Sequence, residues 1–167
     1  MLWVGAPEMT FQSRLFTRRA LLGAVLVSAT LPRVALAQME QRSSAGREET
    51  DMKIQIAFNG RNFTATLYDN PSARDLASML PLDLAIDDYS NNEKIAYLPR
   101  KLTEEGSGPF ADEAPGDLCY YAPWGNLAFF YAGYRYSKGL IRLGRLDGGI
   151  EPLLTRGKFP LRIEPVS

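Results

Sequence analysis

The chain has 167 residues, no histidine, a single cysteine and equal numbers of basic and acidic residues. This length suits one domain. The lack of histidine excludes Ser–His–Asp and Cys–His catalytic sites and the common histidine zinc sites, and a single cysteine excludes an intrachain disulfide. Only one of the 19 acidic residues but four of the 19 basic ones lie in the first 37 positions, so the remainder carries a net charge of −3. We therefore expect no nucleic-acid partner, no metal and no cofactor.

Residues 1–37 are typical of a removable export signal. A basic segment at 14–19 precedes an uncharged apolar run at 20–31, and Ala35 and Ala37 are the small residues expected before a cleavage site. The run is too short to span a bilayer. We predict cleavage after Ala37, a periplasmic or secreted mature protein, and no membrane association after cleavage.

Arg18 and Arg19, followed by Ala-Leu-Leu, resemble the twin-arginine export motif. The small residues of the apolar run and Arg33 just before the cut favour the same route. Leu21 stands where phenylalanine is usual and Gly23 where lysine is frequent, so an ordinary signal remains the alternative. In either case the leader's predicted partner is the export machinery.

The remaining boundaries follow from composition. Met9 begins a complete basic start of its own, so either Met1 or Met9 can be the true start. Residues 38–51 are polar and lack apolar periodicity, which predicts a flexible linker. The folded domain is expected at 52–166.

A β-hairpin opens the domain. Apolar residues alternate with polar ones over 52–58 and again over 62–67. Between the two runs, Asn59-Gly60 is the preferred two-residue turn, because both positions tolerate positive φ.

A helix is predicted next. Asn70 can cap its first turn and Pro71 suits its first position. Leu76 with Met79 and Leu80 gives an apolar stripe at helical spacing, and the following proline ends the helix.

The rest of the domain reads as short strands separated by turns and loops. The predicted strands are 82–86, 94–98, 116–122, 127–132, 139–146 and 159–163. Residues 89–92 are expected to form a turn and 150–154 a short helical turn. The segment 103–116 is rich in glycine and proline, and such a long loop often serves a site. About eight strands favour a barrel or a sandwich.

Three stretches resemble a prokaryotic cyclophilin-like family of small domains. They are Gly-Asp-Leu-Cys-Tyr-Tyr at 116–121, Gly-Asn-Leu-Ala-Phe-Phe-Tyr at 125–131 and Gly-Leu-Ile-Arg-Leu-Gly-Arg-Leu at 139–146. The resemblance implies a mostly β fold, a closed eight-stranded cyclophilin-like barrel with one or two short helices. True cyclophilins are peptidyl-prolyl isomerases that bind proline peptides on the outer face of the barrel.

Phe130 matches the family's aromatic pocket wall, and Arg100 is the candidate for its arginine. The family's glutamine is replaced by Ala128, its histidine is absent, and no tryptophan falls within 139–146. These differences favour an exported module that binds a peptide or small-molecule ligand without efficient catalysis. The alternative is a weak peptidyl-prolyl isomerase acting on exported proteins, so the sequence leaves enzymatic activity open.

Aromatic residues supply the remaining candidates for ligand binding. Tyr121 belongs to a tyrosine-rich cluster that forms either a ligand groove or ordinary barrel packing. Trp124 lies in a turn, where it either folds back onto the barrel or faces a partner. Phe129 and Phe130 point to opposite faces of one strand, so one of them belongs to the core. Cys119 is expected to be a small buried residue, and acidic pairs such as Asp87-Asp88 to be solvated loops.

Overall fold

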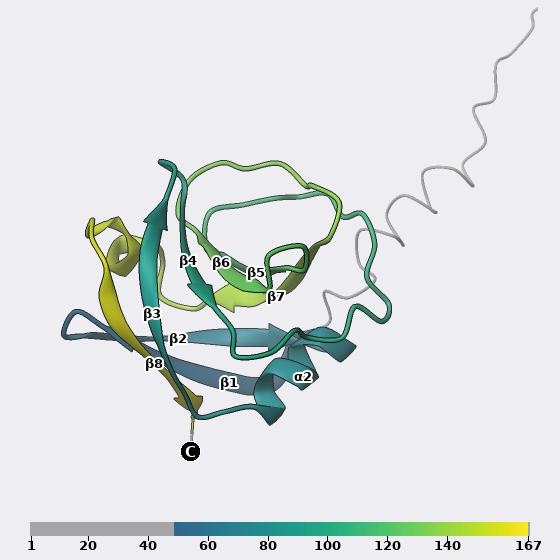
Figure 1. The fold of residues 1–167 in the computed structure, drawn as a ribbon, viewed down its shortest axis with the longest axis horizontal. Helices are drawn as coiled ribbons and strands as arrows, with labels where there is room; N and C mark the ends of the chain where they lie inside the picture. Colours follow the sequence, from purple (N-terminus) through teal and green to yellow (C-terminus); the bar gives the residue numbers. More distant parts are fainter. Residues whose placement is uncertain (1–48, 167) are drawn as a thin grey trace, which may run out of the picture. The chain divides into compact units, whose positions relative to one another are not determined.

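Eight antiparallel strands close into a barrel in the computed structural model, which describes residues 49–166 (Figure 1). The strands are β1 (Glu49–Phe58), β2 (Arg61–Tyr68), β3 (Leu82–Tyr89), β4 (Glu93–Tyr97), β5 (Asp117–Tyr121), β6 (Asn126–Phe130), β7 (Leu140–Leu146) and β8 (Phe159–Pro165). Their order around the barrel is β1-β2-β7-β5-β6-β4-β3-β8, and β8 pairs with β1 to close it. The predicted closed eight-stranded barrel is confirmed. Arg18, Arg19, Ala35 and Ala37 lie outside the described residues.

The first hairpin forms as the sequence predicts. Asn59 and Gly60 both have positive φ, 50° and 70°, which this tight turn requires. Phe58 and Arg61 pair directly across it. Strand β1 begins at Glu49, three residues before the predicted domain start, because backbone pairing with β2 does not depend on apolar side chains.

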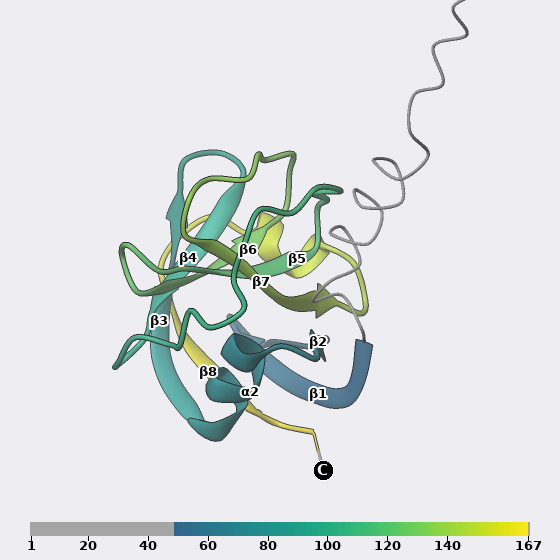
Figure 2. The ribbon, with the colours of Figure 1, turned by 90° about the vertical axis from the view of Figure 1, so that its right-hand side faces the viewer.

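Two short helices lie on opposite sides of the barrel (Figures 1 and 2). Helix α2 (Pro71–Ser78) is capped by Asn70, whose side chain accepts a hydrogen bond of 2.9 Å from the Ala73 amide. The 3-10 helix η1 (Glu151–Leu154) occupies the other side. Leu76 of α2 and Leu153 of η1 are both fully buried in the core, so each helix packs its apolar side chain against the barrel interior. Among the described residues, neither helix is long and apolar enough to cross a membrane.

Successive side chains of β5 and β6 point alternately into the core and towards the outer face of the barrel. Their inward side chains join the main core: Leu118, Tyr120, Leu127 and Phe129. Their outward side chains belong to a second, smaller apolar cluster: Cys119, Tyr121, Ala128 and Phe130. Phe129 is therefore the core member of the Phe129–Phe130 pair, and Phe130 belongs to the outer face.

Strand β3 is longer than the sequence predicts. It continues past Ile86 to Tyr89, and Asp88 pairs with Lys94 of β4 rather than lying in a solvated loop. The Lys94 ammonium is fully buried, 2.7 Å from the Asp88 carboxylate. An acid can stay within a strand when a buried cation neutralises it, and this partner is invisible in local sequence.

Candidate functional site

A groove of about 290 Å³ lies on the outer face of the barrel. Strands β4, β5, β6 and β7 and the end of β3 line it, together with the two turns that precede β4 and β6 and the loop that follows β6. Its aromatic lining residues are Tyr89, Tyr121, Trp124, Phe130 and Tyr134. The groove therefore combines residues from segments that are far apart in the sequence.

Trp124 is the centre of one aromatic group. Its ring meets Tyr89 edge-on at 5.2 Å between centroids and Tyr121 edge-on at 5.4 Å. Edge-to-face contacts of this kind are the favoured geometry for aromatic pairs. The tryptophan thus folds back onto the barrel, yet it remains 47% exposed. It keeps enough free surface to contact a ligand.

Phe130 and Tyr134 form the second aromatic group. Their rings stack nearly parallel, 3.6 Å apart with an interplanar angle of 7°. Tyr134 belongs to the loop that follows β6, so the stacking holds this loop against the barrel. The Tyr134 hydroxyl also donates a hydrogen bond of 2.7 Å to the buried carboxylate of Asp117.

Glu93 lies between the two aromatic groups. On the outer face, Tyr89 of β3 pairs with Glu93, and Glu93 in turn pairs with Phe130 of β6. Directly opposed residues in antiparallel strands point to the same face, with their Cβ atoms roughly 5 Å apart. The carboxylate is therefore flanked on both sides by an aromatic side chain.

Burial raises the pKa of Glu93 from its ordinary 4.5 to about 7. Desolvation is its cause, because a half-buried carboxylate loses hydration that favours the charged form. No described residue donates a hydrogen bond to the Glu93 carboxyl group or forms an ion pair with it. The groove thus holds a carboxyl that changes charge near neutral pH and has no internal partner.

Asn126 supplies a second acceptor without a donor. Its side-chain nitrogen donates a hydrogen bond of 3.0 Å to the Leu127 carbonyl. Its side-chain oxygen is buried and has no hydrogen-bond partner among the described residues. Buried polar atoms are nearly always paired, so this oxygen suggests a partner that comes from outside the chain.

The outer face beside the groove is covered around Arg142 of β7 by the long loop between β4 and β5. Phe110, from the long loop between β4 and β5, lies 4.3 Å from the Arg142 guanidinium. Arg142 forms an ion pair of 3.4 Å with Asp117. Burial also raises the pKa of the Cys119 thiol, which keeps it protonated and unreactive. The long loop therefore packs beside the groove rather than lining it.

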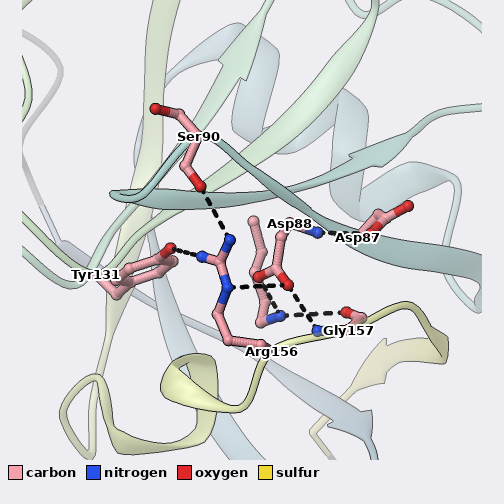
Figure 3. A network of polar contacts seen from close by, with 7 residues as sticks. Asp87, Asp88, Ser90, Tyr131, Arg156 and Gly157 are labelled. Carbon is pink, nitrogen blue, oxygen red and sulfur yellow. Dashed lines mark hydrogen bonds and ion pairs between the residues drawn. The ribbon is translucent and has the colours of Figure 1, made fainter.

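A polar network holds the hairpin that carries Tyr89 and Glu93 (Figure 3). Arg156 lies 3.4 Å from the Asp88 carboxylate, donates to the Tyr131 hydroxyl at 2.6 Å, and donates to the Ser90 carbonyl at 3.1 Å. Asp88 and Ser90 are the neighbours of Tyr89 in the chain. This network therefore positions the aromatic and acidic side chains that this hairpin presents to the groove.

The structure brings three of the four predicted ligand-binding residues together. Tyr121, Trp124 and Phe130 all line the groove, whereas Arg100 does not. The Arg100 guanidinium instead forms a 2.6 Å ion pair with Asp75 of α2 and helps to tie the following loop to that helix. The sequence placed Arg100 correctly after β4 but could not reveal a partner 25 residues earlier.

Sequence reasoning missed Tyr89, Glu93 and Arg135 as groove residues. Tyr89 was expected in a turn, but it is the last residue of β3. Extending β3 by three residues pairs it with Glu93, so a correct strand end would have revealed both. Arg135 lies in an irregular loop, and no sequence pattern marks it.

A second hollow of about 300 Å³ lies over β1, β3 and β8. Its charged residues include Asp83 and Arg162, which are already joined by an ion pair of 2.6 Å. One aromatic residue, Phe58, lines it. Because Asp83 and Arg162 already pair with each other and the aromatic surface of this hollow is small, the groove at Phe130 is the better candidate site.

Comparison with known proteins places this barrel in a family. The model of the cyclophilin-like family matches residues 56–164. The chain belongs to the cyclophilin-like family. The solution structure of a hypothetical protein from Archaeoglobus fulgidus is similar to this cyclophilin-like domain, with a TM-score of 0.58 and 17% identity over 72% of this chain and 99% of that one. Such a low identity supports the fold alone. No curated protein matches the chain.

In this cyclophilin-like domain, Ala128 stands where the resemblance implies a glutamine. Ala128 lies between Ile95 and Cys119 in its cross-strand row, so this part of the outer face offers no side-chain amide. Aromatic surface and unpartnered acceptors are present instead. Arg135 lines the groove as a cationic donor.

Proposed function

We propose that the mature chain is an exported module that binds a peptide or small ligand in this groove without efficient catalysis. The observation that carries the proposal is the set of aromatic side chains around Glu93, a partly buried carboxyl with no internal partner. Leaving an acceptor desolvated and unpaired costs folding free energy. A ligand that supplies a donor would recover that cost, which accounts for the arrangement.

Arg135 supports weak prolyl isomerisation as the second candidate. Isomerisation needs no nucleophile, only an apolar pocket for the ring and a donor that weakens amide resonance over a barrier of about 18–20 kcal/mol. Phe130 offers the apolar wall, and Arg135 lines the same groove. The guanidinium lies on a loop and is exposed, so its position is less fixed than that of a strand residue.

A prolyl-isomerase assay separates these two functions. The chain is assayed beside a genuine cyclophilin, with Phe130→Ala and Arg135→Ala variants. The binding proposal predicts no acceleration at concentrations where the cyclophilin is readily active. Acceleration that both variants abolish would replace it with the isomerase proposal.

Ligand binding itself can be followed through tryptophan fluorescence. The chain contains two tryptophans, Trp3 and Trp124. A Trp3→Phe chain therefore reports the groove alone, whether or not the leader is removed. Screening peptides and small molecules should give saturable changes in emission that Phe130→Ala weakens at least about tenfold, as expected for loss of a stacking wall. A screen without any saturable change would contradict the proposal.

Export is the remaining part of the proposal, supported by the leader sequence. Replacing Arg18 and Arg19 with lysine keeps the charge but removes the twin-arginine pair. We expect the variant to accumulate inside the cell as a precursor, and the exported wild-type protein to begin at Gln38 by mass spectrometry. Unchanged export of the variant would favour an ordinary signal.

A further inference from the structure

The groove contains acceptors that lack donors. The Glu93 carboxylate and the side-chain oxygen of Asn126 both lack a hydrogen-bond partner among the described residues. Asn126 is 98% buried, because its exposed fraction is 2%. Both atoms need a hydrogen-bond donor, so the chemistry of the groove selects for a ligand that brings donors.

The aromatic lining favours a positive charge on that ligand. The faces of aromatic rings carry negative potential and attract ammonium groups within about 6 Å, most strongly for tryptophan. Tyr89 and Phe130 flank Glu93 in one cross-strand row, and Trp124 contacts Tyr89. A carboxylate flanked by aromatic side chains is an environment that favours an organic cation.

The spacing of the two acceptors sets the length of the ligand. Glu93 pairs with Phe130, and Asn126 lies four residues before Phe130 on the same face of β6. Four residues of strand span about 13 Å. Trp124 contacts both Tyr89, which pairs with Glu93, and Tyr121, which pairs with Asn126, so its ring can cover an alkyl stem between the two acceptors.

Other titratable groups around the groove do not neutralise Glu93. Arg135 is exposed. The pKa of Glu113 is lowered mainly by the hydrogen bond from the Tyr136 amide, and the charge of Arg135 adds to this effect. Burial raises the pKa of Tyr134 and of Cys119, so both stay neutral. The other ionisable groups lining the groove are the phenols of Tyr89 and Tyr121.

We propose that the groove binds an elongated alkylammonium ligand, with its charged nitrogen at Glu93 and a second hydrogen-bond donor at Asn126. This inference rests on the proposed binding function and names its ligand class. A free linear diamine satisfies both acceptors and lays its methylene chain along the aromatic rings. Binding an ammonium ionises Glu93 and releases its proton, so affinity rises with pH.

The test uses the full Trp3→Phe chain and follows Trp124 fluorescence. The probes are 1,8-diaminooctane, 1,8-octanediol as a neutral match and n-butylamine as a short monoamine. We expect saturable binding of the diamine, at least about tenfold weaker binding of the diol and the monoamine, and an increase in diamine affinity of about tenfold between pH 6 and pH 8 as a carboxyl of pKa about 7 ionises.

Glu93→Gln should reduce diamine affinity at least about tenfold near pH 8 and remove its pH dependence. Glu104→Gln removes the same charge from an exposed loop residue outside the groove, and it should change neither. Asn126→Ala should bring the diamine close to the monoamine in affinity. Because Glu93→Gln removes an unpartnered acid, loss of folding is not expected to obscure the result.

Equal binding of diol and diamine would overturn the cation inference and leave the binding function intact. The same conclusion follows if proline peptides bind while the diamine does not. If no peptide, fragment or amine changes Trp124 emission, the inference and the binding function both fail.

Discussion

Replacing Glu93 with glutamine should stabilise the folded barrel above neutral pH and have no effect in acid. Burial raises the pKa of Glu93 from 4.5 to about 7, so the folded protein binds this proton more tightly than the unfolded chain does. The carboxyl therefore costs no stability below its unfolded pKa. The loss of folding free energy grows as pH rises from 4.5 towards 7, and it reaches its full size above that range.

The size of the effect follows from the same linkage. A pKa that moves from 4.5 to about 7 corresponds to at most about 3 kcal/mol near pH 8. The side chain is only half buried, so water screens part of this cost, and we expect about 1–2 kcal/mol. Glutamine keeps the shape and cannot ionise, so the variant avoids the cost.

Urea unfolding near pH 4 and near pH 8, followed by fluorescence, measures the difference. We expect Glu93→Gln to raise the free energy of unfolding only at the higher pH, and the exposed control Glu104→Gln to change it little at either. An equal change at both values, or destabilisation near pH 8, would refute the reasoning. A stabilised variant that loses ligand affinity would show that the acid is present for function.

Three further predictions test the support of the site, each by urea unfolding. Lys94→Met leaves the Asp88 carboxylate without its buried partner and should lower the free energy of unfolding by about 2–3 kcal/mol. Adding Asp88→Asn should recover part of this loss, and no recovery would exclude a charge effect. Asn70→Ala removes the helix cap and a 3.0 Å hydrogen bond to the Arg142 carbonyl and should cost about 1–2 kcal/mol; a cost near zero would mean that water replaces both bonds. Gly144→Ala should cost at least about 2 kcal/mol, because its Cβ would lie 2.3 Å from a backbone oxygen of β2; a neutral result would show that β2 and β7 separate easily.

Local sequence signals predicted most of the fold. The Asn59-Gly60 turn and the Asn70 cap are encoded by residues whose conformational preferences act over a few positions. Alternation along β5 and β6 correctly indicated that Phe129 and Phe130 face opposite sides. The barrel closure, by contrast, came from the resemblance, because alternation alone fits a sandwich equally well.

The candidate site was only partly predictable, because long-range pairing creates it. Asp88 and Lys94 pair across β3 and β4, and their network also includes Gly157, more than 60 residues away. Without that network, the acids after Ile86 looked like the end of a strand. This network fixes the register of β3 and β4, and that register places Tyr89 beside Glu93.

Chemical-shift mapping of the isotope-labelled chain tests the central claim most directly. A ligand found in the fluorescence screen is titrated while the backbone amides are followed by NMR. The binding proposal predicts shifts concentrated in β4, β6 and the loop at 131–139. Shifts centred on the hollow near Phe58 and Arg162, with the Phe130 region unchanged, would contradict it.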